Sequence, residues 1–127
     1  MPDEFVNVRY IVDDVEAAIA FYTTHFGFEL RTSAAPAFAD VTRGPLRLLL
    51  SGPLSSAGRP MPDGRVPRPG GWNRIHLIVG DITAEFERLR AAGLTFRNEI
   101  VTGPGGRQSV LDDPAGNAIE LFQPAGT

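Results

Sequence analysis

The chain has 127 residues, a formal net charge of −3 at pH 7 and no cysteine, with 43% hydrophobic and 21% charged residues. This length and balance predict one globular domain over residues 1–127. The composition excludes disulfides, thiolate catalysis and cysteine-based metal sites, and the negative charge without a basic run argues against nucleic acid. There is no signal-peptide pattern and no apolar run near the roughly 20 residues that span a bilayer, so we expect a cytoplasmic protein without a membrane segment.

The sequence contains an internal repeat, in which Asn7 aligns with Arg74 and Asp14 with Asp81, each pair 67 positions apart. In both copies a short apolar stretch predicts a strand, and the aspartate after it is a good helix N-cap. The predicted helices carry apolar residues at helical spacing: Val15, Ile19, Tyr22 and Phe26 in the first, and Ile82, Phe86 and Leu89 in the second. A glycine suited to end a helix follows in each copy, Gly27 and Gly93.

Three short strands separated by Gly or Pro are predicted after each helix. They cover residues 28–33, 37–42 and 46–51 in the first copy, and 95–101, 107–113 and 117–123 in the second. The fold class is therefore α+β, with two βαβββ modules at about 5–51 and about 72–124. Between them, residues 52–71 form a loop in which ten of twenty residues are Gly or Pro. We expect no regular structure in this loop, which is either a passive linker or a cover over a site.

Strand alternation divides each leading strand into two faces. Val8, Tyr10 and Val12 are expected to pack on the first helix, as are Ile75, Leu77 and Val79 on the second. The opposite faces begin with polar residues in both copies. If the two modules pair into one curved sheet, one concave surface collects a polar set: Asn7, Arg9, Arg74, His76 and Glu120.

The segment DDPAGNAIELF ends the second module. Asp112, Asp113 and Asn117 are expected to shape its turn through side-chain hydrogen bonds to the backbone. Glu120 follows in mid-strand, where a carboxylate is costly unless it faces solvent or a partner.

Two of these motifs resemble the vicinal oxygen chelate superfamily, which includes glyoxalase I, extradiol dioxygenases and bleomycin-resistance proteins. One is the strand–Asp–helix stretch VDDVEAAIAFYTTHFGF, and the other is the C-terminal GPGGRQSVLDDPAGNAIELFQP. The resemblance covers the chain except for residues 52–71. It implies a cup-shaped open barrel of mixed sheet with helices outside, a small-molecule ligand and a homodimer.

Family members with metal chemistry use up to four ligands, which fall by position on Asn7, Leu48, Arg74 and Glu120. Only Glu120 matches a typical ligand, because Leu48 has no donor atom and Arg74 is a cation without an acceptor. The resemblance therefore implies a degraded metal site and no cofactor. The alternative is a divalent metal at Glu120.

His76 lies on the polar face and is suited to general acid–base chemistry near neutral pH, which makes Glu120 and His76 the candidate catalytic residues. We expect the cup to be lined by ligand-binding residues from both modules: Asn7, Arg9, Phe38, Leu48, Trp72, Arg74 and Phe122. Arg74 either pairs with Glu120 or binds an anionic ligand.

The leading interpretation is a metal-free protein of the glyoxalase/bleomycin-resistance type that sequesters or carries a small anionic or aromatic ligand. The alternative is an enzyme, a glyoxalase-like lyase, isomerase or dioxygenase, that uses Glu120 with His76 or Arg74. A domain acting only through protein partners is a third interpretation.

Overall fold

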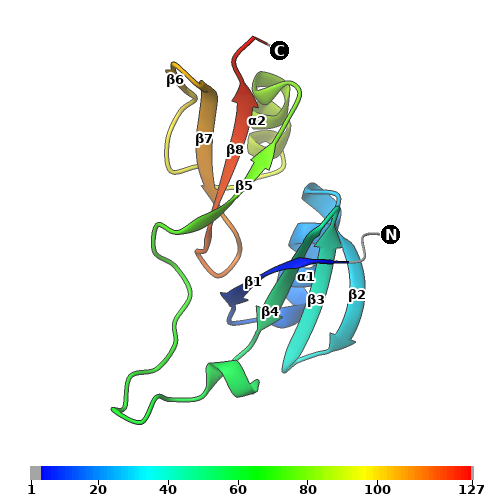
Figure 1. Ribbon diagram of the computed structural model, residues 1–127, viewed down its shortest axis with the longest axis vertical. Helices are drawn as coiled ribbons and strands as arrows, with labels where there is room; N and C mark the ends of the chain where they lie inside the picture. Colours follow the sequence, from blue (N-terminus) through cyan, green and yellow to red (C-terminus); the bar gives the residue numbers. More distant parts are fainter. Residues whose placement is uncertain (1–3, 127) are drawn as a thin grey trace. The chain divides into compact units, whose positions relative to one another are not determined.

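The computed structural model describes residues 4–126, and the chain forms two compact units, Met1–Gly70 (unit 1) and Gly71–Thr127 (unit 2). Each unit contains one βαβββ module (Figure 1). The predicted α+β class and the two repeated modules are confirmed.

Unit 1 has a four-stranded mixed sheet in the order β1-β4-β3-β2. Its elements are β1 (Val6–Ile11), α1 (Val15–His25), β2 (Glu29–Ala34), β3 (Phe38–Arg43) and β4 (Leu46–Ser51). Strand β1 runs parallel to β4, whereas β3 is antiparallel to both β4 and β2.

Unit 2 repeats this topology in the order β5-β8-β7-β6. Its elements are β5 (Arg74–Ile78), α2 (Ile82–Ala91), β6 (Val101–Gly103), β7 (Gly106–Asp112) and β8 (Ala118–Pro124). Here β5 is parallel to β8, as β1 is to β4, and the other pairs are antiparallel. The internal repeat in the sequence is therefore a repeat of fold.

The helices begin where the sequence predicts. The side chains of Asp14 and Asp81 accept hydrogen bonds from the backbone N–H groups of Ala17 and Ala84, at 3.1 Å in both cases. These bonds satisfy donors of the first helical turn that have no partner within the helix. Beyond the helix ends, Gly27 and Gly93 have φ values of 70° and 90°, the left-handed conformation predicted for them.

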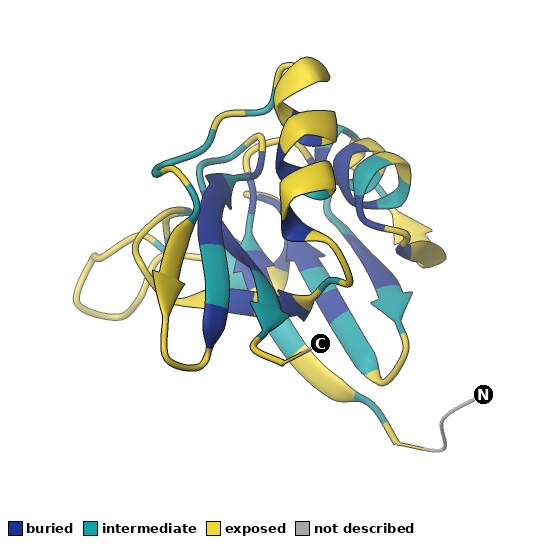
Figure 2. Cartoon of the chain, turned by 90° about the horizontal axis from the view of Figure 1, so that it is seen from above, coloured by how far each residue is buried: buried dark blue, intermediate teal, exposed yellow. Residues whose placement is uncertain are grey.

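One face of each sheet packs against the helix of its own unit, and each helix is buried on one side only (Figure 2). In unit 2 the predicted stripe Ile82, Phe86 and Leu89 is buried. In unit 1 three of the four stripe residues are buried, but Ile19 is only half-buried. The buried face of α1 is instead centred on Ala18 and Phe21.

The strand predicted over residues 95–101 is mostly absent. An isolated bridge joins Phe96 to Leu111, and the strand β6 forms only at Val101–Gly103. The physical reason is Asn98, whose side-chain Oδ1 accepts from the N–H of Val110 at 2.8 Å. This side chain takes the place of a backbone carbonyl and ends the ladder there.

The loop at 52–71 also departs from the prediction, because it contains the short 3₁₀ helix η1 (Ser56–Gly58). Ser55 caps it: its hydroxyl donates to the carbonyl of Gly52 at 2.7 Å and accepts from the N–H of Gly58 at 3.2 Å. Gly52 itself is tightly enclosed, since a Cβ there would lie 2.8 Å from the carbonyl oxygen of Pro36. The start of the loop is therefore packed onto unit 1.

Among residues 4–126, no helix is both long and apolar enough to cross a membrane.

We predict that Gly52→Ala lowers the free energy of unfolding by about 1–3 kcal/mol, because the new methyl group would overlap backbone atoms. Gly80→Ala is the matched control, since its Cβ would meet nothing within 4 Å and its φ is not left-handed. Urea unfolding of both variants provides the measurement. Equal losses in the two variants would contradict the close packing at Gly52.

Candidate functional site

Glu120 lies in the middle of β8 and points away from the core. Its neighbours Ile119 and Leu121 are fully buried on the α2 side of the sheet, so Glu120 faces the helix-free side. Its register partners are His76 on β5 and Val110 on β7. The predicted division of β5 into two faces is confirmed, because Ile75 and Leu77 are buried while the alternate residues are exposed.

The Glu120 carboxylate is compensated by Arg74. The Nη2 and Nε atoms of Arg74 lie 2.9 Å and 3.0 Å from Oε1 of Glu120. The side chain of Glu120 is only 9% exposed, so this ion pair offsets the cost of withdrawing a carboxylate from water. Both guanidinium nitrogens meet the same carboxylate oxygen. The second oxygen, Oε2, has the Nε2 atom of His76 at 3.5 Å.

His76 and Phe122 form an aromatic wall beside this carboxylate. Their ring centroids are 4.8 Å apart with an interplanar angle of 38°. The side chain of His76 is 45% exposed and Phe122 is half-buried, so the wall remains accessible from the helix-free side. This face therefore presents a charged pair beside an aromatic pair. The first is Arg74 with Glu120, and the second is His76 with Phe122.

Trp72 stands just before β5 and is held by arginines on two sides. Its backbone carbonyl accepts from Nη1 of Arg74 at 3.2 Å, and its ring lies 4.6 Å from the guanidinium carbon of Arg97. Arg97 is fixed by a hydrogen bond from Nε to Asp112 at 2.6 Å and by bonds to the carbonyls of Gly71 and Gly116. Trp72 is nevertheless 69% exposed, which leaves most of its indole open to a partner.

Arg97 was not singled out from the sequence. It lies in a stretch predicted as an ordinary strand, and its partners are 15 and more residues away along the chain.

The prediction for Asp112 was also wrong, because this side chain pairs with Arg97 rather than with the turn backbone. Asp113 shapes the turn as predicted, since its Oδ1 accepts from the N–H groups of Ala115 and Asn117 at 2.9 Å. A carboxylate beside a second acidic residue is the signal that could have indicated an arginine partner.

The remaining predicted site residues lie in unit 1. Asn7 and Arg9 are exposed on the same face of β1, and Arg9 donates from Nη1 to the hydroxyl of Ser51 at 2.8 Å. Phe38 on β3 is half-buried and is the register partner of Ser51. Arg9, Ser51 and Phe38 are therefore neighbours on the helix-free face of unit 1.

Leu48 lies on the other face. It is fully buried and shares the helix side with Leu50, so it belongs to the core. The register places Arg9 opposite Leu49, as it places His76 opposite Glu120. The residue equivalent to Glu120 is therefore Leu49, one position along from the expected Leu48.

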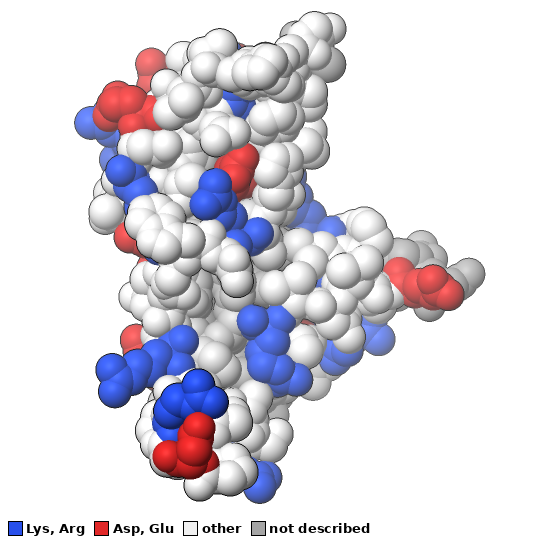
Figure 3. All heavy atoms as spheres, turned by 60° about the vertical axis from the view of Figure 1, so that its left-hand side comes forward, with Lys and Arg blue, Asp and Glu red and all other residues white. Residues whose placement is uncertain are grey.

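These donors do not fit a divalent metal centre. Among residues 4–126 there is no group of three or more His, Asp or Glu side chains placed to hold a metal ion. Around Glu120 the second donor is His76 alone, and the guanidinium of Arg74 is bound to the carboxylate. First-row metals need three or four good ligands, and a bound cation repels them. Figure 3 shows basic and acidic side chains scattered among uncharged ones on the visible face.

The chain belongs to the Glyoxalase/Bleomycin resistance protein/Dioxygenase superfamily, whose family model matches residues 4–121. Its sequence is 30% identical over 112 residues to "Putative glyoxylase CFP32" of Mycobacterium bovis and Mycobacterium tuberculosis. That match covers 87% of this chain, which spans only 41% of the length of these curated relatives.

Two solved structures are similar over nearly the whole chain. A superfamily member from Sphaerobacter thermophilus is 31% identical with a TM-score of 0.75, covering 97% of this chain and 98% of its own. TnmS3, an antibiotic binding protein from Streptomyces sp. CB03234, is 26% identical with a TM-score of 0.72, and the match covers 98% of both chains. These similarities agree with the topology of both units.

We predict that Arg74→Met lowers the free energy of unfolding by about 1–3 kcal/mol, because it leaves the buried Glu120 carboxylate uncompensated. The double variant Arg74→Met/Glu120→Leu should recover most of this loss, since no charge then remains to be solvated. Urea unfolding followed by the fluorescence of Trp72, the single tryptophan, reports on this unit. An equal loss in the single and double variants would show that Arg74 does not act through Glu120.

Proposed function

We propose that the protein is a metal-free small-molecule-binding protein of the glyoxalase/bleomycin-resistance type, which sequesters or carries a small ligand. The Arg74–Glu120 ion pair is the observation that carries this proposal. A guanidinium compensates this buried carboxylate, and by the family resemblance Arg74 and Glu120 stand at positions where members with metal chemistry have metal ligands. A site without Lewis-acid chemistry is suited to holding a molecule rather than polarising it.

The ligand of this site is aromatic in part. Trp72 offers a rigid ring surface, since the Arg97 guanidinium at 4.6 Å is itself held by Asp112 and two carbonyls. A preorganised ring loses little conformational freedom when a flat molecule stacks on it. His76 and Phe122 supply a second aromatic surface. The similarity to TnmS3, an antibiotic binding protein, supports a role in binding.

The same ligand is anionic in part. A guanidinium has five N–H donors. Nε of Arg74 donates to Glu120 and Nη1 to the carbonyl of Trp72, and Nη2 lies 2.9 Å from Oε1 of Glu120. Two donors of Arg74 thus remain for an acidic group of the ligand. The 28% exposure of the Arg74 side chain allows such contact.

We propose separate ligand contacts within unit 1 at Asn7, Arg9 and Phe38 on its helix-free face, where Arg9 donates a hydrogen bond to Ser51. Leu49 takes the place of Leu48 in this set because Leu48 is fully buried. The homodimer implied by the family resemblance also remains part of the proposal, and light scattering in solution tests it.

An enzymatic role is the second candidate, as a glyoxalase-like lyase, isomerase or dioxygenase. One observation favours it: Oε2 of Glu120 is not engaged by Arg74 and lies 3.5 Å from Nε2 of His76. Such a pair can pass a proton to or from a ligand held on this face. The putative glyoxylase relatives agree with this role, although they match only over part of their length.

We predict that 2-naphthoate binds to the protein more tightly than its neutral amide, 2-naphthamide, in calorimetric titrations. Trp72→Leu should weaken the binding of both compounds by about tenfold, because the naphthalene ring can no longer stack on the indole. Arg74→Met should weaken only naphthoate, because only this ligand carries the charge that Arg74 meets.

Arg88→Gln is the matched control for losing an arginine, since Arg88 lies on α2 and pairs with Glu85. It should leave both affinities unchanged. Binding that is insensitive to Trp72→Leu, or the absence of binding by either compound, would contradict the proposed site.

A further inference from the structure

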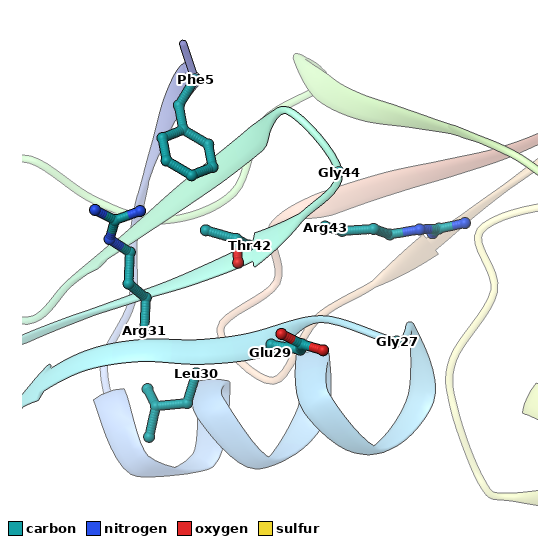
Figure 4. A pocket seen from close by; sticks show the side chains of 8 residues that line it. All are labelled: Phe5, Gly27, Glu29, Leu30, Arg31, Thr42, Arg43 and Gly44. Carbon is teal, nitrogen blue, oxygen red and sulfur yellow. The ribbon is translucent and has the colours of Figure 1, made fainter. Parts of the chain in front are cut away.

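Unit 1 contains a pocket that involves none of the residues discussed for the Arg74–Glu120 site. Its volume is about 520 Å³, and it lies at one end of the sheet between the starts of β1 and β2 and the turn from β3 to β4. The residues that matter for its chemistry are Phe5, Glu29, Arg31 and Thr42. Figure 4 shows Phe5 and Glu29 on opposite sides of Thr42, with Arg31 at one end.

Arg31 is a cation fixed in advance at this pocket. The pairing of β2 with β3 shifts register between Leu30 and Thr32, so Arg31 sits at a bulge, a device that re-aims a side chain. Its guanidinium lies 4.8 Å from the ring centroid of Phe5, and its Nε is 4.0 Å from Oδ2 of the buried Asp40. The ring and the carboxylate together hold the guanidinium in place.

The carboxylate of Asp40 does not fully neutralise the charge of Arg31. Asp40 is bound much more closely by Nε of Arg47, at 2.5 Å, than by Arg31 at 4.0 Å. The side chain of Arg31 is 45% exposed, so its outer nitrogens can donate to a second anion. Arg31 is therefore positioned for a carboxylate that comes from outside the chain.

Glu29 supplies the opposite charge. It is exposed and lies directly across from Thr42 in the sheet. Within residues 4–126 its carboxylate forms no hydrogen bond or ion pair, so it lies beyond ion-pair distance of Arg31. The pocket thus holds a cation and an anion that do not neutralise each other, with a hydroxyl group and an aromatic ring beside them.

We propose that this pocket binds a small zwitterion of the amino-acid class with an apolar side chain. The ligand carboxylate meets Arg31, its ammonium group meets Glu29 and the hydroxyl of Thr42, and its side chain lies against Phe5. A molecule with both charges can pair with Arg31 and Glu29 at once. An anion is repelled by Glu29, and a cation is repelled by Arg31. The pocket volume is within the ordinary range for small-molecule sites.

The experiment compares three probes of the same shape by NMR titration of the full chain: L-leucine, 3-methylbutylamine and 4-methylpentanoate. Leucine should bind at least about fivefold more tightly than either analogue, the size of one partly exposed ion pair. The amide signals of Gly27, Thr42 and Gly44 should shift on binding. Equal affinity for leucine and 4-methylpentanoate, or no binding by leucine, would overturn the proposal.

Two variants test the two charges separately. Glu29→Gln should weaken the binding of leucine by about fivefold, because the contact with its ammonium group is removed. The binding of 4-methylpentanoate, which has no ammonium group, should be no weaker. Arg31→Gln should weaken the binding of leucine. It should leave the binding of 3-methylbutylamine no weaker, because this compound has no carboxylate. If loss of the Asp40 contact unfolds this variant, Glu29→Gln alone decides the matter.

Arg43→Met is the control within the same pocket, since its side chain extends away from Glu29 and Arg31 (Figure 4). It should change leucine affinity by less than about twofold. Glu120→Gln should also leave leucine binding unchanged, which keeps this result separate from the Arg74–Glu120 site. A loss with Arg43→Met as large as that with Arg31→Gln would show that general positive charge, rather than a built site, attracts the ligand.

Discussion

The Arg74–Glu120 ion pair determines what the helix-free face of unit 2 can do. A carboxylate that is 9% exposed in the middle of a strand must be compensated, and Arg74 compensates it at 2.9 Å. The same guanidinium bonds to the carbonyl of Trp72, so the pair also fixes the entry into β5. In the site that we propose, the ligand meets the remaining donors of Arg74, Oε2 of Glu120, the His76–Phe122 wall and the exposed Trp72 ring.

The repeat duplicates the fold without duplicating the chemistry. Glu120 on β8 has Leu49 as its equivalent on β4, so the first module lacks a carboxylate there. Unit 1 instead carries the buried Asp40 on β3, at the position that Val110 occupies on β7. Each carboxylate is matched by an arginine of its own unit, Arg74 or Arg47. The two sheets therefore present different charges from the same scaffold.

The fold follows from the sequence where the determining interactions are local. The helix starts follow from Asp14 and Asp81, whose carboxylates bond three residues ahead, and the faces of β5 follow from strict alternation. The prediction is wrong or silent where the pairing of strands, or of residues far apart in the chain, determines the structure. In LRLLLS, leucines occupy both faces of the strand, so alternation does not show which leucine faces the helix. The sequence therefore predicts Leu48 at the position that Leu49 occupies. Arg97 depends on partners far along the chain and left no local pattern.

We propose that the carboxylate of Glu120 is bound by the guanidinium of Arg74 rather than by a metal ion. Thermal unfolding of the wild-type protein and of Glu120→Ala, each with and without Ni²⁺, Zn²⁺ or Mn²⁺, tests it most directly. A metal that binds only the folded state must raise the melting temperature. We expect shifts below about 1 °C in both proteins, because Arg74 binds the carboxylate in the wild-type protein and Glu120→Ala has no carboxylate at this position. A large shift in the wild-type protein that Glu120→Ala abolishes would contradict it.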